Sequence, residues 1–169
     1  ILISYKISYQ IIGLNILDSL KPYHQPIIET KLSDPRAAPI RAYQSDAGAD
    51  LMSTQEFMLY PGYMKMLDTG VSVKIPVGFV GLVFNRSSQG KIEVQLANGT
   101  GIIDSAYRGN IKVLLKNNGE NAYFIRAFET RIAQLIITPV VLARFVPTTD
   151  EANWEDTDRG TGGFGSTGV

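Results

Sequence analysis

The segment from Asn98 to Gly109 carries many polar side chains between glycines. Asn98 presents both a hydrogen-bond donor and an acceptor. Asp104 is a candidate general base, able to orient and deprotonate an attacking water. Taken alone, the segment reads more simply as a β-hairpin, with glycines in tight turns and Asp as a capping residue. The residues by themselves favour this structural interpretation.

The composition limits which catalytic groups the chain can use. There is no cysteine, and the one histidine, His24, lies in a proline-rich stretch near the start. Thiolate chemistry is therefore excluded, and a Ser-His-Asp triad or a His-ligated metal would depend on a residue that is more simply an exposed loop histidine. We expect the base to be a carboxylate and any metal to be a hard cation on oxygen ligands.

A second segment, Asn85-Arg86-Ser87-Ser88-Gln89-Gly90, has groups that suit phosphate. Arg supplies a fixed fork of donors, Ser supplies a hydroxyl and an amide, and a helix starting here would aim further amides at an anion. A plain helix cap by Ser87 is the simpler interpretation, and it is compatible with phosphate binding. The net charge of zero, without a local basic run, argues against a nucleic-acid partner but not against a small anion.

Two further polar residues need an explanation. Gln134 interrupts the apolar run of residues 131–140, and a buried amide must find hydrogen-bond partners. Asp50 follows Gly48, a common arrangement in turns, so alone it is a weak signal.

The last ten residues, 160–169, include five glycines, with Arg159 before them and Phe164 in their middle. Such a segment cannot hold one conformation without a partner. It is either a disordered terminus or a segment whose ring, cation and backbone amides close over a nucleotide. The residues alone do not decide between these alternatives.

The elements that would position these groups are strands. From Pro26 onward, short β-rich runs alternate with turn residues, and the best short-helix candidate follows residues 85–88. The expected strands lie at 26–32, 64–75, 78–84, 92–96, 110–116 and 131–140. This pattern predicts an all-β fold, a β-barrel or jelly roll.

Five segments resemble, in order, the five motifs of the dUTPase family. They lie at 47–51, 85–90, 98–109, 131–139 and 159–168. One such match would be weak, but five at compatible spacing are specific. The resemblance implies a distorted β-barrel with one short helix and a glycine-rich C-terminal arm, which hydrolyses dUTP to dUMP and pyrophosphate with Mg²⁺. It also implies a homotrimer whose active sites lie between subunits.

By this resemblance, Asp104 is the catalytic base, and the Tyr107 ring packs beneath the deoxyribose and excludes a 2′-hydroxyl. Uracil is recognised by Asn98 and by backbone groups at Ile102, Ile103 and Lys112. Phosphate is held by Arg86, Ser87, Ser88, Gln134 and Arg159, whereas the arm places Phe164 on uracil and Gly165, Ser166 and Thr167 on phosphate. Asp50 and Gln134 would contact the metal through water, and the substrate phosphates would hold it otherwise.

Three positions depart from the family's usual residues: Asn85 for Pro, Gln89 for an apolar residue and Ala106 for an acidic one. Two alternatives also stay open. A dCTP deaminase of this fold would carry a catalytic Glu on the strand at 109–116, which has none. A regulatory or binding protein of this fold would be expected to have lost site residues, whereas all five segments keep theirs.

The sequence predicts three parts: an extension of unknown role (1–25), a barrel (26–150) and the arm (151–169). The extension is apolar but interrupted, and it lacks both the length of a membrane span and the pattern of a signal peptide. We therefore expect a soluble cytoplasmic protein with neither a nucleic-acid nor a membrane partner.

Overall fold

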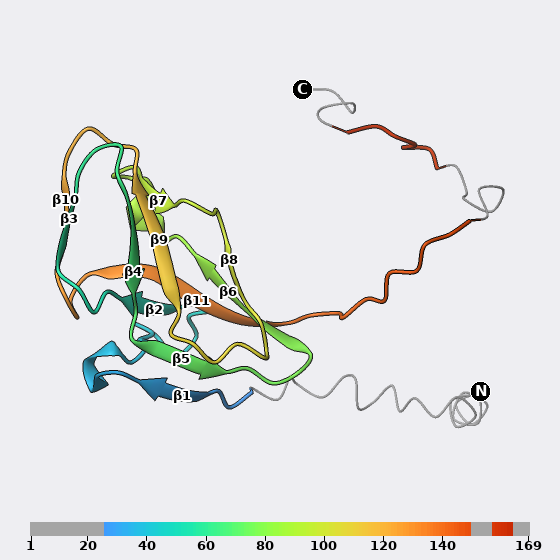
Figure 1. The fold of residues 1–169 in the computed structure, drawn as a ribbon, viewed down its shortest axis with the longest axis horizontal. Coiled ribbons are helices and arrows are strands. Elements are labelled where there is room, and N and C mark those ends of the chain that lie inside the picture. Colours follow the sequence, from blue (N-terminus) through green and yellow to red (C-terminus); the bar gives the residue numbers. More distant parts are fainter. Residues whose placement is uncertain (1–25, 150–156, 164–169) are drawn as a thin grey trace, which may run out of the picture.

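The computed structural model describes residues 26–149 and 157–163 (Figure 1). The strands of this part are β1 (Glu29–Leu32), β2 (Ala49–Met52), β3 (Phe57–Leu59), β4 (Met64–Asp68), β5 (Val71–Lys74), β6 (Phe79–Phe84), β7 (Val94–Leu96), β8 (Gly101–Ile103), β9 (Lys112–Asn117), β10 (Tyr123–Ile125) and β11 (Arg131–Pro139). The helices within the described residues are a 3-10 turn, η1 (Pro35–Ala37), and a single α-helical turn, α3 (Ser87–Gly90). The all-β prediction with one short helix is confirmed.

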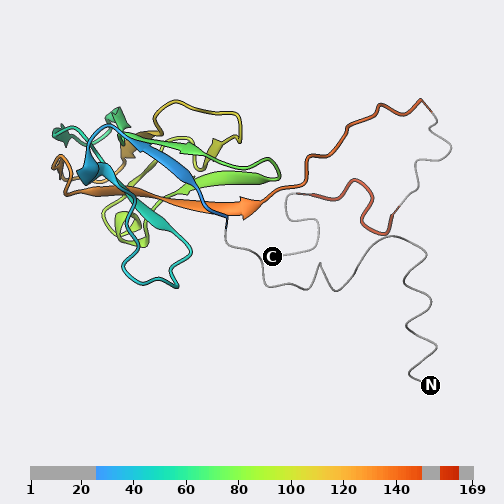
Figure 2. The ribbon, with the colours of Figure 1, turned by 90° about the horizontal axis from the view of Figure 1, so that it is seen from below.

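The strands form two main sheets, in the orders β2-β11-β6-β8 and β4-β9-β7, and two strand pairs, β1-β5 and β10-β3. Side chains alternate along each strand, so one face of β9 is buried through Val113, Leu115 and Asn117 while Lys112 is exposed. The buried face meets Leu51 and Ile132 of the other sheet in one hydrophobic core. The sheets therefore enclose the core as a distorted barrel (Figures 1 and 2).

The predicted strand at 64–75 is wrong as a single strand, because the chain turns at Gly70 between β4 and β5. Gly70 has a φ of 70°, and a Cβ there would lie 2.3 Å from Ser33 Oγ and 2.7 Å from Thr54 Cγ2. Only glycine fits a backbone that is both left-handed and this crowded.

The predicted hairpin at 98–109 is also wrong. β8 does not pair with β7 or β9. It pairs antiparallel with β6, with Gly101 opposite Val83 and Ile103 opposite Gly81. β8 therefore forms an edge of the four-stranded sheet.

Beyond β11 the chain leaves the barrel in an extended course over residues 140–149, and this part and residues 157–163 lie apart from the barrel in both views (Figures 1 and 2). Its apolar side chains are exposed, for example Val141 at 89% and Phe145 at 94%. Within the described residues, no helix has the length and apolarity needed to cross a membrane.

Candidate functional site

Three neighbouring strands line up the first group of predicted site residues. In the ladders, Asp50 on β2 is opposite Gln134 on β11, and Gln134 is opposite Phe84 on β6, two residues before Arg86. Arg86 Nε lies 2.7 Å from Asp50 Oδ1, and its NH2 lies 3.2 Å from Oδ2. Arg131 adds a third bond, with NH1 2.9 Å from Oδ2. Because the Asp50 side chain is only 15% exposed, this carboxylate fixes the arginine fork that phosphate binding requires.

Gln134 has a hydrogen-bond partner within the chain, in addition to the phosphate and metal-bound water that the resemblance assigns to it. Its Nε2 donates to the carbonyl of Asn85 at 2.7 Å. Its Oε1 lies against Gly48, where a Cβ would come within 2.4 Å of that oxygen. Gly48 is therefore required for close approach, and the Gln134 amide joins β11 to the segment that carries Arg86.

The helix after β6 begins differently from the sequence expectation. Its N-cap residue is Arg86, so the predicted cap by Ser87 is wrong. The Gln89 side chain replaces it, because Gln89 Oε1 accepts from the Arg86 N–H at 2.9 Å. Ser87 and Ser88 are left exposed, with Ser88 Oγ 3.4 Å from Arg86 NH1. The Ser88 hydroxyl therefore lies beside the guanidinium, and neither serine hydroxyl caps the helix.

A second group of predicted residues lies on β8 and the turn that follows. Asn98 precedes the strand and donates through Nδ2 to the Thr100 carbonyl at 3.3 Å. Ile102 is 67% exposed and Ile103 partly buried. The carboxylate of Asp104 is exposed and makes no hydrogen bond or ion pair with any described residue. It is thus available to a ligand, as is the outer backbone edge of β8.

Tyr107 is held by contacts that the sequence did not predict. Its hydroxyl donates to the Asn110 carbonyl at 2.8 Å. The Asn110 side chain in turn accepts from Ser72 Oγ at 2.8 Å and donates to Asp68 Oδ2 at 3.3 Å. Lys112 begins β9 in register with Asp68, close to this network. Asn110 gave no signal in the sequence because its partners lie about forty residues away in the chain.

The two groups do not meet within one chain. Ile103, the residue before Asp104, pairs with Gly81 near the start of β6. Arg86 lies beyond the end of β6. At about 3.3 Å per residue, this places the Cα atoms of Asp104 and Arg86 roughly 15–20 Å apart along the direction of β6. A single chain therefore separates the candidate base from the candidate phosphate-binding arginine.

The arm contributes one described site residue. Arg159 is exposed, and its Nε donates to the Gly162 carbonyl at 3.1 Å. Its segment, drawn in red, lies apart from the barrel (Figure 1). Phe164, Gly165, Ser166 and Thr167 lie outside the described residues, as do residues 1–25.

No group of three or more His, Asp or Glu side chains gathers as a metal site within the described residues. Asp50 is a lone carboxylate that already accepts from two guanidinium groups, with the Gln134 amide beside it. This donor set fits a Mg²⁺ that keeps its waters and takes its direct ligands from a substrate.

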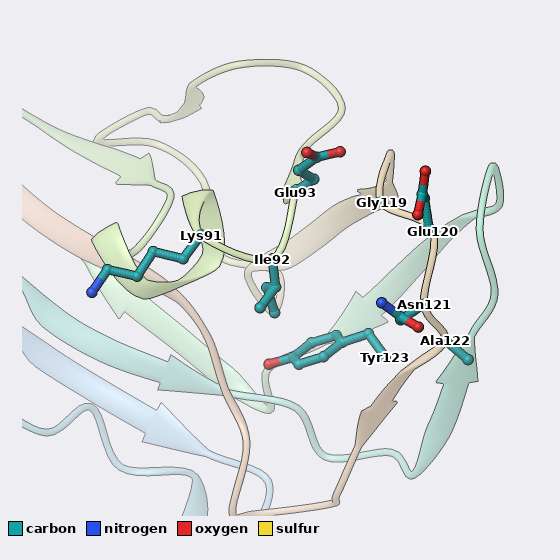
Figure 3. A pocket seen from close by; sticks show the side chains of 8 residues that line it. All are labelled: Lys91, Ile92, Glu93, Gly119, Glu120, Asn121, Ala122 and Tyr123. Carbon is teal, nitrogen blue, oxygen red and sulfur yellow. The ribbon is translucent and has the colours of Figure 1, made fainter.

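A hollow beside the end of α3 shares no lining residue with either group (Figure 3). It is lined by Lys91, Ile92, Glu93, Gly119, Glu120, Asn121, Ala122 and Tyr123. Burial raises the pKa of the Tyr123 hydroxyl there. None of the predicted site residues that the structure describes lines this hollow.

Comparisons with known proteins identify the family of the chain. The sequence profile of the dUTPase family matches residues 34–168. A deoxyuridine 5′-triphosphate nucleotidohydrolase of Cutibacterium acnes is 42% identical over 144 residues, covering 85% of this chain and 93% of the relative. One from a Mycobacterium species is 43% identical over 133 residues, covering 77% and 86%.

Solved structures show the same fold. A mutant dUTPase of Staphylococcus bacteriophage 80alpha with dUpNHpp superposes with a TM-score of 0.74 at 28% identity, covering 86% of this chain and all of that one. A mutant dUTPase from phage phi11 of S. aureus, described with a structural Mg(II) ion, gives a TM-score of 0.67 at 26% identity, covering 73% and 97%.

Proposed function

The chain belongs to the dUTPase family, and on that premise we propose which residues perform its reaction and how. The protein is a dUTP diphosphatase, which hydrolyses dUTP to dUMP and pyrophosphate. Among the described residues, the observation that best supports the assignment of roles is the pairing of Arg86 with Asp50 beside Gln134, set against an Asp104 carboxylate that stays exposed. The arginine can hold a phosphate chain, and the carboxylate can accept a proton.

Arg86 binds the phosphate chain of dUTP with Ser87, Ser88 and Gln134. The guanidinium is preorganised by the bonds to Asp50, so little side-chain entropy is lost when phosphate binds. The exposed hydroxyls of Ser87 and Ser88, the two residues after Arg86, donate to phosphate oxygens. From the arm, we assign Arg159, Gly165, Ser166 and Thr167 to the phosphates and Phe164 to the face of uracil, where the arm closes the site.

Asp104 accepts a proton from a water that attacks the α-phosphorus in line with the leaving group. The new bond joins the water oxygen to the α-phosphorus. The bond that breaks joins the α-phosphorus to the oxygen that bridges to the β-phosphorus. Pyrophosphate leaves and dUMP carries the new oxygen. Arg86 neutralises charge that develops on the phosphate oxygens.

The chemistry that Mg²⁺ supplies when bound is charge neutralisation on the phosphates, which makes pyrophosphate a better leaving group. Asp50 and Gln134 would contact its water shell. Both side chains lie beside Arg86, where the phosphate chain is expected.

Uracil is recognised along the edge of β8. Asn98 offers a donor and an acceptor that match O4 and N3–H, and backbone groups at Ile102, Ile103 and Lys112 complete the recognition. The Tyr107 ring supports the deoxyribose and leaves no room for a 2′-hydroxyl. Such exclusion gives specificity without an extra attractive contact.

A homotrimer with shared sites would unite the two groups. The roughly 15–20 Å between Asp104 and Arg86 in one chain is too long for one nucleotide to place its α-phosphorus at both. We therefore assign each active site an Asp104 from one subunit and an Arg86 from a neighbour, with the arm reaching across.

The test is pyrophosphate release from dUTP, with UTP, dTTP and dCTP as controls. Release from dUTP alone supports the proposal. Ammonia release from dCTP would instead support a deaminase. Tight dUTP binding without turnover, in the presence of Mg²⁺, would support a non-catalytic role and refute the mechanism.

A further inference from the structure

A buried amide lies directly behind the phosphate-binding arginine. Gln89 is 2% exposed. Its Oε1 accepts from the Arg86 N–H at 2.9 Å, and its Nε2 donates to the Ile132 carbonyl at 2.9 Å. Both polar ends are therefore satisfied by main-chain groups, one in the segment that carries Arg86 and one in β11.

The segment that carries Arg86 needs such support. α3 has only four residues, too few for a helix to be held by its own hydrogen bonds. The Arg86 guanidinium nevertheless reaches Asp50 with two bonds. A fixed backbone at Arg86 keeps two guanidinium bonds on Asp50. The remaining guanidinium donors then face Ser88 and solvent.

Asn85 performs a related role at the start of the same segment. Its Oδ1 accepts from the Leu96 N–H of β7 at 2.7 Å, while its carbonyl accepts from Gln134. Asn85 and Gln89 are the two positions of this segment that depart from the family's usual Pro and apolar residue. In this chain, both are amides that tie the segment to neighbouring strands.

We propose that Gln89 is a positioning residue for phosphate recognition, which holds the Arg86 backbone so that its guanidinium meets the substrate's phosphate chain. The inference rests on the proposed function of Arg86. Gln89 itself touches no substrate, because it is buried between Arg86 and β11.

The experiment compares Gln89→Met with the unmodified protein. Met keeps the length of the side chain but removes both hydrogen bonds. Affinities for pyrophosphate and for 2′-deoxyuridine are measured separately by calorimetry. We expect pyrophosphate binding to weaken about tenfold, as the loss of one well-placed charged hydrogen bond would produce, with deoxyuridine binding unchanged. The matched control, Gln95→Met on the exposed face of β7, should change neither affinity.

Equal weakening of both ligands would mean a purely structural role, and no weakening would mean no role; either result overturns the proposal. If Gln89→Met does not fold, hydrogen exchange of the Arg86 amide in the unmodified protein decides. Protection comparable to that of the β11 amides supports the proposal, and exchange at the rate of an open loop overturns it. An unmodified protein that fails to hydrolyse dUTP would refute the proposed function, and the exchange rate would still test whether Gln89 holds Arg86.

Discussion

The Asp104 carboxylate is exposed and without a partner among the described residues, so its proton-accepting chemistry can be removed without disturbing a packed contact. Asp104→Asn keeps the shape of the side chain but cannot accept a proton. A general base contributes about 10² to 10⁴ in rate, so we expect kcat for pyrophosphate release to fall by about that factor. Binding of a non-hydrolysable dUTP analogue should persist. Glu120→Gln, an exposed change away from both groups, is the control. Near-normal turnover in Asp104→Asn would show that another group is the base.

Gly109 fixes where the Tyr107 ring lies. A Cβ at this position would come within 2.6 Å of Tyr107 Oη and 2.8 Å of its Cζ. We therefore expect Gly109→Ala to displace the ring and to lower the preference for dUTP over UTP, measured as a ratio of kcat/KM values, by roughly tenfold. Gly90→Ala is the matched control, since a Cβ there meets no atom within 4 Å. An unchanged ratio in Gly109→Ala would mean that Tyr107 does not select the sugar.

At the scale of single residues, the sequence could predict a role where a residue differs sharply from its neighbours in the chain. Gln134 was recognisable because one amide interrupts an apolar strand, and its need for a partner is met by Asn85. Gln89 and Asn110 gave no such contrast, because their partners come from remote strands: Ile132 lies 43 residues from Gln89, and Ser72 lies 38 residues from Asn110. The Ser87 cap failed for a different reason, because a local contact from Gln89, three residues after Arg86, takes that place.

At the scale of elements, Asn117 joins β9 to β3. It is fully buried, and its Nδ2 donates to the carbonyls of Leu59 and Asn121, while Oδ1 accepts from the Gly119 N–H. Asn117→Ala leaves buried main-chain groups without partners, which should lower the free energy of unfolding by about 2–4 kcal/mol. Urea denaturation measures this change in the free energy of unfolding. Asn118→Ala, exposed beside it, should stay within about 0.5 kcal/mol. A small effect at Asn117 would mean that water replaces these bonds.

The turn η1 should contribute a pH dependence. The side-chain bond from Arg36, followed by its backbone N–H, lowers the pKa of Asp34 from 3.8 to about 2. A carboxyl whose pKa is depressed by folding contributes stability above its unfolded pKa and loses it as pH falls through the folded one. The Tm advantage of the unmodified protein over Asp34→Asn should therefore shrink between about pH 4 and pH 2. Glu56→Gln, an exposed carboxylate, measures the background. If the Tm difference between the unmodified protein and Asp34→Asn stays constant over this pH range, Asp34 is not the source of the pH dependence.

Elements were predictable from sequence where they are long. The runs that became β6, β9 and β11 have six to nine residues and clear apolar content. β3 and β10 have three residues each and escaped prediction, because so short a run shows little alternation, although β7, equally short, lies within the predicted strand at 92–96. The split at Gly70 required the contacts with Ser33 and Thr54, which no local pattern reveals.

At the scale of the molecule, the separation of Asp104 from Arg86 makes a prediction about assembly. If each active site takes its base from one subunit and its arginine from a neighbour, two inactive variants can complement each other. Asp104→Asn and Arg86→Ala should each be nearly inactive alone. When the two are unfolded together and refolded as mixed trimers, sites form in which both residues are intact. Random assembly of equal amounts gives such a pairing at roughly a quarter of the sites, so about a quarter of normal activity should return.

The control for this experiment mixes Asp104→Asn with Asp104→Ala in the same way. Because both variants lack the same residue, no arrangement of subunits can supply the base, and activity should stay at the level of the separate variants. A gain in the first mixture alone requires that Asp104 and Arg86 act across a subunit boundary. If the first mixture also stays inactive while mass measurement shows mixed trimers, each site draws both residues from one chain. The β6–β8 pair would then have to rearrange to bring them together, because its register holds them at opposite ends.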